Sequence, residues 1–120
     1  MIYIGTDIVE ISRIDQVIAE KGDRFLSYVF TQTEQSICNS KVLPNMHYGG
    51  KFAAKEAVKK ALLSSNVKKN IPLNSIEIQN KTDGAPMVIL LDEIDCLANL
   101  QVSISHTEEY ATATAILEIQ

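Results

Sequence analysis

The spacing of apolar and polar residues in the first quarter of the chain predicts one strand followed by helices. Residues 2–10 are rich in β-branched side chains, which favour an extended strand. Apolar residues then recur at helical spacing, which predicts a helix over residues 12–21 with Ser12 as its N-cap and Gly22 after its end. We expect a second, short helix or helical turn over residues 24–30.

Two local signals predict helices in the middle of the chain. Thr31 and Glu34 have the spacing of a capping box, so a helix should begin between them. Pro44 suits the first turn of a helix, and we expect the longest helix over residues 45–63. Its alanines favour helix formation and allow close packing; they are Ala53, Ala54, Ala57 and Ala61.

The second half of the chain has the two-residue alternation of β-strands. The expected strands are residues 75–80, 87–91, 100–106 and 110–119. Asp83 and Gly84 should form the turn between the first two strands, and Asp92 should cap a short helix over residues 92–99. In the last strand, alternate residues from Ala111 to Leu117 share one face. The predicted class is α+β, with a mostly antiparallel sheet packed against one long helix.

Length and composition are typical of one soluble globular domain. The 120 residues are 46% apolar and 22% charged, so we expect a single domain over residues 1–120. No apolar run approaches the length of a membrane span, and the N-terminus lacks the basic start of a signal peptide. Cys38 and Cys96 do not have metal-ligand spacing, so we expect reduced, buried and structural cysteines in a cytoplasmic protein.

Charge is distributed unevenly along the chain. The net charge is −4, yet residues 51–70 carry six lysines and only one acid, Glu56. A general nucleic-acid binder needs a broad basic surface, so this composition argues against that class. The local basic patch suits a small polyphosphate or an acidic partner protein. The alternative is a solvated lysine face without a ligand.

The same stretch aligns charged side chains along the predicted long helix. Residues four apart share a face, so Phe52, Glu56 and Lys60 form one ridge. The neighbouring ridge carries Lys51, Lys55 and Lys59. A carboxylate among cations can hold a metal ion that bridges to phosphate, while the lysines bind phosphate oxygens. The pattern therefore predicts chemistry on a phosphorylated ligand.

A second carboxylate, Asp7, lies inside the apolar first strand, where an unpaired charge is costly to bury. Gly5 shares its face and leaves room for a ligand to approach. Asp7 and Glu56 together would make a two-carboxylate Mg²⁺ site. The alternative is that Asp7 pairs with a lysine or caps backbone amides.

His106 ends an alternating strand and is followed by Thr107. This position suits hydrogen bonding to a ligand, although a single histidine there is also typical of a core or turn residue. The chain has no nucleophile elbow, no Walker loop and no GxGxxG motif.

Four motifs occur in a fixed order along the whole chain. They are GTDIVE at residues 5–10, FAAKEA at residues 52–57, DGAP at residues 83–86 and VSISHT at residues 102–107. In this order and spacing the chain resembles the holo-(acyl-carrier-protein) synthases, the small bacterial type within the 4'-phosphopantetheinyl transferase superfamily. The resemblance implies transfer of 4'-phosphopantetheine from coenzyme A to a serine of apo acyl carrier protein, with release of adenosine 3',5'-bisphosphate, in support of fatty acid biosynthesis.

The resemblance also implies roles for individual residues. Asp7 and Glu56 would hold Mg²⁺, or Mn²⁺ in its place, and Lys60 would neutralise or protonate the leaving phosphate. The general base stays open between Glu56 and a metal-bound water or hydroxide. With the lysines above, the expected coenzyme A-binding residues are Lys51, Lys55, Lys59, Lys60, Pro86, His106 and Thr107.

The acidic carrier protein is expected to bind the first helices. The residues predicted to contact it are Arg13, Val17, Lys21, Arg24 and Phe25. The resemblance carries this role most directly to Arg13 and Arg24, whereas Lys21 also fits a solvated helix face. The assembly it implies is a homotrimer with active sites between subunits.

Three positions depart from the family pattern. Lys51 stands where the family usually has arginine, residues 63–67 lack the usual glycine-rich loop, and Glu108 follows the His-Thr pair. Two other functions stay open on the sequence: a non-catalytic module that binds coenzyme A or a carrier protein, and a metal-dependent hydrolase of nucleotides or coenzyme A.

Overall fold

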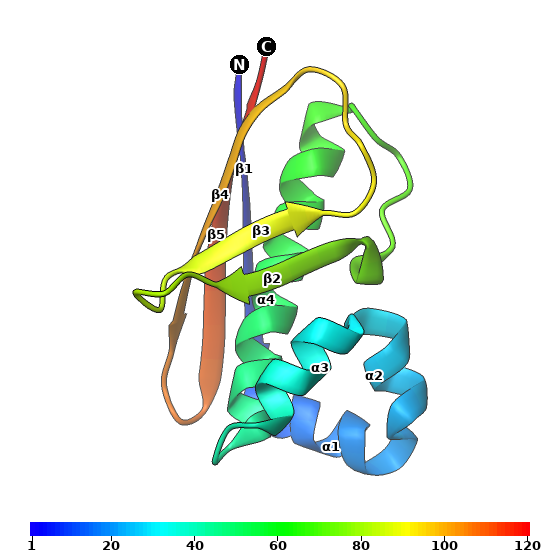
Figure 1. The fold of residues 1–120 in the computed structure, drawn as a ribbon, viewed down its shortest axis with the longest axis vertical. Coiled ribbons are helices and arrows are strands. Elements are labelled where there is room, and N and C mark those ends of the chain that lie inside the picture. Colours follow the sequence, from blue (N-terminus) through cyan, green and yellow to red (C-terminus); the bar gives the residue numbers. More distant parts are fainter.

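A computed structural model describes residues 1–120, and Figure 1 shows one strand followed by helices in the first half of the chain and mainly strands in the second. The helices are α1 (Ile11–Lys21), α2 (Asp23–Val29), α3 (Gln32–Asn39) and α4 (Pro44–Ser65), with a short 3₁₀ helix at Leu73–Ser75. The strands are β1 (Ile2–Glu10), β2 (Ile76–Asn80), β3 (Pro86–Leu90), β4 (Leu97–His106) and β5 (Tyr110–Ile119). None of these helices is long and apolar enough to cross a membrane.

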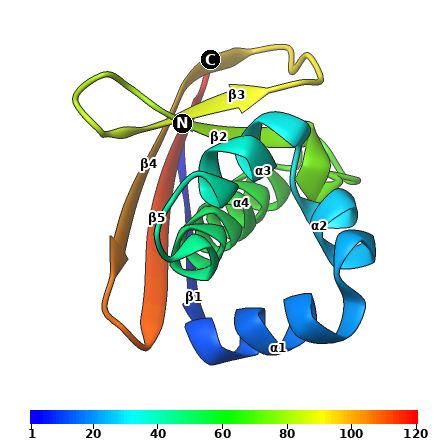
Figure 2. The ribbon, with the colours of Figure 1, turned by 60° about the horizontal axis from the view of Figure 1, so that its bottom comes forward.

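The strands form two antiparallel sheets that flank helix α4. One sheet has the order β1-β5-β4, and the hairpin of β2 and β3 forms the other. Helix α4 packs against β1 and β5 on one face of the larger sheet, and no element covers the opposite face (Figure 2). The predicted α+β class with one long helix against antiparallel strands is confirmed, although the strands divide into two sheets rather than one.

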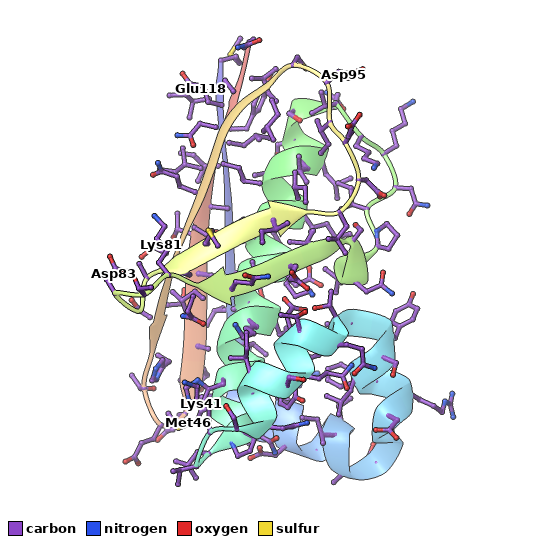
Figure 3. All side chains as sticks on the ribbon, in the orientation of Figure 1. Lys41, Met46, Lys81, Asp83, Asp95 and Glu118 are labelled. Atoms are coloured by element: carbon purple, nitrogen blue, oxygen red, sulfur yellow. The ribbon has the colours of Figure 1, made fainter.

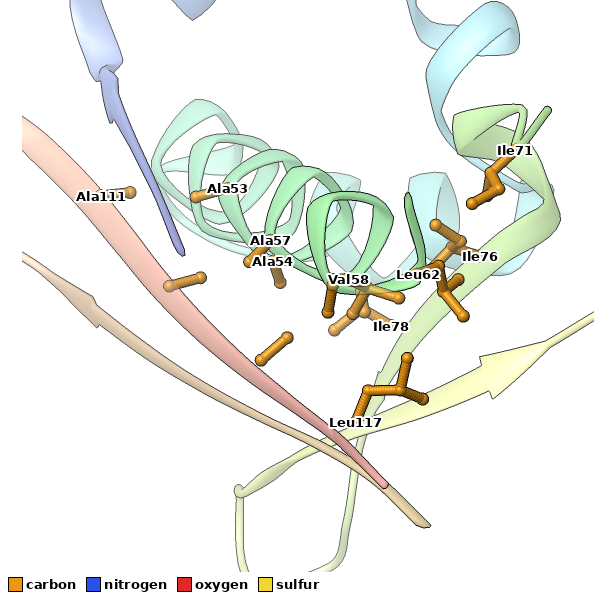
Figure 4. Packing of buried hydrophobic residues seen from close by; sticks show 13 residues of the cluster. Ala53, Ala54, Ala57, Val58, Leu62, Ile71, Ile76, Ile78, Ala111 and Leu117 are labelled. Carbon is orange, nitrogen blue, oxygen red and sulfur yellow. The ribbon is translucent and has the colours of Figure 1, made fainter. Parts of the chain in front are cut away.

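Small residues let α4 lie close to the sheet. Alanines of the helix face Ala111, Ala113 and Ala115 of β5, and larger apolar residues of β2 close the core on the other side (Figure 4). Alternate residues of β5 are buried from Ala111 to Leu117, as the sequence predicts. The closest approach is at Gly5 of β1, where a Cβ atom would lie 1.8 Å from the backbone oxygen of Ala57. The prediction that Gly5 makes room for a ligand is therefore wrong: it makes room for α4.

Local signals fix some element boundaries and fail at others. The capping box is confirmed, because Thr31 Oγ1 accepts a hydrogen bond from the Glu34 amide and the Glu34 carboxylate accepts one from the Thr31 amide. The predicted N-cap at Ser12 is wrong, since α1 already begins at Ile11 directly after β1 and Glu10 provides no side-chain cap. The chain passes from strand to helix without a capping residue.

The predicted helix over residues 92–99 is also wrong. Residues 91–96 form bends, irregular backbone and a turn, and β4 begins at Leu97, which pairs with Ile119 of β5. Cys96 lies in this turn and is exposed, so the prediction that both cysteines are buried is confirmed for Cys38 and wrong for Cys96. A bulge follows between Leu97 and Asn99. Strand pairing and the packing of Ile94 and Leu97 against the core outweigh the local helix signal of Asp92 here.

Candidate functional site

Asp7 and Glu56 come from different elements and line one cavity of about 540 Å³. Asp7 lies on the helix-facing side of β1, opposite Ala113 of β5, and Glu56 lies on α4. Both side chains are half-buried rather than enclosed. The structure therefore brings together the two carboxylates that the sequence predicts as a pair, and leaves them open to a ligand.

Lys60 lies beside Asp7 at the mouth of this site. Its ammonium donates to Asp7 Oδ1 at 3.1 Å and to the backbone oxygen of Thr6 at 2.9 Å. The Lys60 side chain is 52% exposed, so this pair adds little to stability. Asp7 therefore has the lysine partner that the sequence left as an alternative. Glu56 takes part in none of the three ion pairs of the molecule.

The donor set of the cavity fits one kind of metal site. No group of three or more histidine, cysteine, aspartate or glutamate side chains is placed to hold a metal ion. Mg²⁺ commonly uses only one or two carboxylates and takes its other oxygens from substrate phosphates and water. Asp7 and Glu56 fit that pattern, because they supply hard oxygen ligands next to a cation and leave positions for phosphate.

The wall of the cavity beyond Asp7 and Glu56 is mostly apolar, and its further charged members are Glu10 and Arg13. Arg13, Val17 and Phe25 line it, together with Phe52 of α4 and Tyr110 at the start of β5. Three of the five residues predicted to bind a carrier protein thus border the carboxylate pair. Lys21 and Arg24 lie outside the cavity on exposed surfaces of α1 and α2.

A second pocket, of about 220 Å³, contains other predicted ligand-binding residues. It is lined by Lys51, Pro86 and His106, which come from α4, β3 and the end of β4. It shares no lining residue with the carboxylate cavity. We name the two sites the carboxylate cavity and the histidine pocket.

Thr107 does not line the histidine pocket. Its hydroxyl oxygen accepts hydrogen bonds from the backbone amides of Glu109 at 3.2 Å and Tyr110 at 3.1 Å. These bonds close the turn between β4 and β5. The structure thus gives Thr107 a role in the turn that sets the position of His106.

The structure corrects the prediction for Lys55. This side chain is fully buried and forms an ion pair with Glu34 of α3. The other carboxylate oxygen of Glu34 accepts the backbone N–H of Ile78 at 2.7 Å, and the Phe30 ring lies under the lysine ammonium. No atom of Lys55 is exposed to bind coenzyme A in this chain, because its charge is used to satisfy a buried carboxylate.

Lys51 is also turned inward. It is 5% exposed, and its ammonium donates to the backbone oxygen of Ile78 at 2.8 Å. Glu34 of α3 and Lys51 of α4 thus bond to the backbone N–H and the backbone oxygen of Ile78. Because these groups are occupied, another strand cannot pair with the free edge of β2 at Ile78. Burial lowers the pKa of Lys51 below its ordinary value. Burial also lowers the pKa of Lys55, and the negative charge of Glu34 offsets only part of this effect. Lys59, one turn further on, makes no hydrogen bond and stays partly exposed.

Residues 63–67 contain no glycine, yet the end of α4 has a left-handed backbone conformation. Asn66 ends the helix with φ of 60°, a left-handed conformation that asparagine tolerates better than most residues. Lys68 follows it and pairs with Asp92 at 3.1 Å. Its ammonium is therefore engaged in a surface ion pair at this end of the molecule.

The residues of these sites that the sequence does not predict include one histidine and one tyrosine. His47 lines the histidine pocket, and Tyr110 lines the carboxylate cavity. His47 precedes Lys51 by four positions on α4, so helical spacing could have placed it on the same face. No comparable signal marks Tyr110, because its place at the cavity depends on how β5 pairs with β1.

Comparison with protein families identifies relatives over most of the chain. Residues 3–115 match the family model described as the 4'-phosphopantetheinyl transferase superfamily. A holo-(acyl-carrier-protein) synthase of Protochlamydia amoebophila is 44% identical over 116 residues, which are 94% of this chain and 94% of the relative. The protein of that name from Chlamydia pneumoniae is 43% identical and is aligned over 97% of this chain and 96% of its own.

Solved structures show the same fold. A coenzyme A complex of holo-(acyl-carrier-protein) synthase from Helicobacter pylori has a TM-score of 0.83 and 30% identity, covering 96% of this chain and 99% of that one. The ACPS–CoA complex of Chronobacterium ammoniagenes has a TM-score of 0.85 and 26% identity, covering 100% and 98%. The similarity therefore extends over the elements that form both sites.

Proposed function

Because the chain belongs to the holo-(acyl-carrier-protein) synthases of the 4'-phosphopantetheinyl transferase superfamily, we propose that it transfers 4'-phosphopantetheine from coenzyme A to a serine of apo acyl carrier protein. The observation that carries this proposal is the carboxylate cavity, where Asp7 and Glu56 meet beside Lys60. The transfer serves fatty acid biosynthesis in the cytoplasm.

Each step of the reaction has a residue suited to it. The serine oxygen forms a bond to the phosphorus that carries pantetheine, and the bond from that phosphorus to the bridging oxygen breaks. The electron pair of that bond leaves with adenosine 3',5'-bisphosphate, whose new negative charge Lys60 neutralises. We assign the serine proton to Glu56, whose carboxylate has no competing ion pair.

The transferase depends on Mg²⁺, for which Mn²⁺ can substitute. Asp7 and Glu56 would hold the ion, which would neutralise the pyrophosphate of coenzyme A when bound. Positioning and charge neutralisation account for most of the catalysis of phosphoryl transfer. Two carboxylates that hold a metal ion and one lysine are the types of group that this catalysis needs.

The carrier protein docks on α1 and α2. Arg13, Val17 and Phe25 connect this surface to the carboxylates, and Lys21 and Arg24 extend it with exposed positive charge. An acidic carrier is attracted by these cations, while its serine reaches into the cavity.

Coenzyme A spans the carboxylate cavity of one subunit and the histidine pocket of its neighbour in a homotrimer. Two observations support this assembly. The two sites share no lining residue in one chain, and the uncovered face of the larger sheet exposes Ile2, Ile4, Ile8 and Ile116. Exposed isoleucines gathered on one sheet face are typical of an interface. Lys51 and Pro86 form walls of the pocket, and Lys59 and Lys60 provide the exposed cations of α4.

Intact-mass spectrometry of apo acyl carrier protein tests the proposal. Incubation with this protein, coenzyme A and Mg²⁺ should add about 340 Da, the mass of one phosphopantetheine group, to the carrier. The same mixture with a chelator should leave the carrier unmodified. Coenzyme A bound without a mass gain would instead indicate a non-catalytic binding module. Release of adenosine bisphosphate without any carrier would indicate a hydrolase.

A further inference from the structure

The ion pair between Lys60 and Asp7 is built so that it can open. The Lys60 ammonium donates to Asp7 Oδ1 at 3.1 Å and to the backbone oxygen of Thr6 at 2.9 Å. An ammonium group has three N–H donors, so one donor of Lys60 has no partner within the protein. The Lys60 side chain is 52% exposed and that of Asp7 is 16% exposed, and a pair so close to solvent is weak enough to break.

Lys60 and Glu56 reach Asp7 from two different hollows. Glu56 lines the carboxylate cavity together with Asp7, whereas Lys60 does not. Lys60 lines a separate hollow of about 300 Å³, which Asp7 shares and which Thr6 and Thr112 border. The ammonium therefore has space to leave the carboxylate, while its hydrogen bond to Thr6 keeps it beside the site.

The proposed function gives Asp7 and Lys60 new partners. A divalent cation held by Asp7 and Glu56 carries twice the charge of Lys60 and repels its ammonium at short range. Lys60 needs its donors for the phosphate whose charge it neutralises, yet one of them is bonded to Asp7. We propose that Lys60 is the counterion of Asp7 only in the metal-free protein, and that it gives up this carboxylate to a divalent cation and turns to the pyrophosphate of coenzyme A. This inference deepens the proposed function and rests on it.

Such an exchange of partners predicts that loss of Lys60 has opposite effects on the two ligands. Lys60→Met removes the charge that competes for Asp7, so a divalent cation alone should bind more tightly. The same variant lacks the cation that meets the pyrophosphate, so coenzyme A should bind more weakly. A lysine that only held Asp7 in place would behave differently, because its loss would weaken the binding of both ligands.

Electron paramagnetic resonance measures the binding of Mn²⁺ alone, because the sharp signal of the free ion is lost when it binds. Lys60→Met should bind Mn²⁺ about fivefold more tightly than the wild type, the upper end of what an exposed ion pair contributes. Lys59→Met is the matched control, since Lys59 is the neighbouring cation of α4 and makes no hydrogen bond. Its affinity for Mn²⁺ should change by less than about twofold. Neither lysine is buried, so both variants should fold.

Exposed carboxylates elsewhere on the molecule also attract Mn²⁺. Figure 3 shows Asp83 at the hairpin turn, and Asp95 and Glu118 near the end of the molecule that carries both termini. Asp7→Asn identifies the ion that is bound at the site, because this variant should bind Mn²⁺ at least about tenfold more weakly than the wild type. Wild-type affinity in Asp7→Asn would overturn the inference, since the measured ion would then lie elsewhere.

Calorimetric titration with coenzyme A in the presence of Mg²⁺ measures the opposite effect. Lys60→Met should bind coenzyme A about tenfold more weakly than the wild type, a typical effect of one charge-assisted contact. Unchanged or weaker Mn²⁺ binding by Lys60→Met, or an equal gain in Lys59→Met, would overturn the inference. If the wild type still modifies the carrier protein, the proposed function stands in that case. Absence of transfer by the wild type would overturn the proposed function and the inference with it.

Discussion

Helix α4 carries lysines on two adjacent ridges, and the two ridges have opposite environments. On the outer ridge, Glu56 lines the carboxylate cavity, and Lys60, which pairs with Asp7, is 52% exposed. On the inner ridge, Lys51 and Lys55 are buried against α3 and β2. The residues of the two ridges are interleaved in sequence and both ridges carry lysine, yet one ridge is open to solvent at the cavity and the other stabilises the fold.

The difference lies in the partners that each ridge meets. Lys55 has the buried carboxylate of Glu34 and Lys51 has the backbone of Ile78, so their charges are fully used inside the molecule. Lys60 meets Asp7 at the surface, where the pair remains open to a phosphate. The role of each lysine on this helix therefore depends on the elements that pack against its face of the helix.

The largest effect is expected where the inner ridge is broken. Lys55→Met leaves the Glu34 carboxylate buried without its cation, which should cost about 3–5 kcal/mol of unfolding free energy. Urea denaturation followed by circular dichroism measures this cost. The double variant Glu34→Gln with Lys55→Met removes the stranded charge and should recover part of the loss. A single variant that keeps wild-type stability but loses affinity for coenzyme A would show that Lys55 binds the ligand and does not stabilise the fold.

Gly5→Ala tests whether both ridges depend on the close approach of α4 to β1. The new Cβ would lie 1.8 Å from the backbone oxygen of Ala57, and overpacking against backbone should cost about 3 kcal/mol. Transfer activity should also fall, because the shift separates Asp7 from Glu56. Thermal unfolding and the transfer assay measure both effects. Gly49→Ala is the control, since its nearest contact would be 3.4 Å, to a side chain of Ile11.

Lys51→Met removes two charged hydrogen bonds to β2, one to the Ile78 backbone oxygen and a longer one to Asn80 Oδ1, but strands no opposite charge. We expect a loss of about 1.5–3 kcal/mol, smaller than that for Lys55. Lys81→Met, at the exposed hairpin turn, should change stability by less than about 0.5 kcal/mol. Equal denaturation midpoints for the Lys51 and Lys81 variants would show that the buried Lys51 ammonium does not stabilise the fold.

The smallest effect is expected at Lys59, which lies between the two environments and makes no hydrogen bond. Lys59→Gln should leave stability within about 0.5 kcal/mol of wild type. It should weaken coenzyme A binding by about threefold at low ionic strength, and added salt should erase the difference. Calorimetry at two salt concentrations checks this. A difference that persists at high salt would indicate a direct, desolvated contact instead.

Much of the fold could be read from local patterns. The alternation along β5 and the capping box of Thr31 and Glu34 are determined by residues that lie close in sequence, and both are confirmed. The helix expected over residues 92–99 fails because pairing of β4 with β5 decides that segment, and no local signal reports a partner strand.

In the site, too, local sequence patterns predict some features, whereas others depend on tertiary packing. Helical spacing correctly aligns Glu56 with Lys60 and could have included His47, but it cannot tell which ridge lies against α3. Glu34 carried only a capping signal, so its pairing with Lys55 was invisible to a search along the sequence. The sequence predicts space for a ligand at Gly5, because it does not show the helix that fills that space.

One measurement tests most directly whether the outer ridge performs the chemistry: the initial rate of phosphopantetheine transfer to apo acyl carrier protein by Glu56→Gln. We expect a rate at least about 100-fold below wild type, as for the loss of a metal-holding, proton-accepting carboxylate, with an unchanged unfolding midpoint. Transfer by the variant at the wild-type rate would contradict a catalytic role of Glu56. So would a loss of rate explained by a matching loss of folded protein.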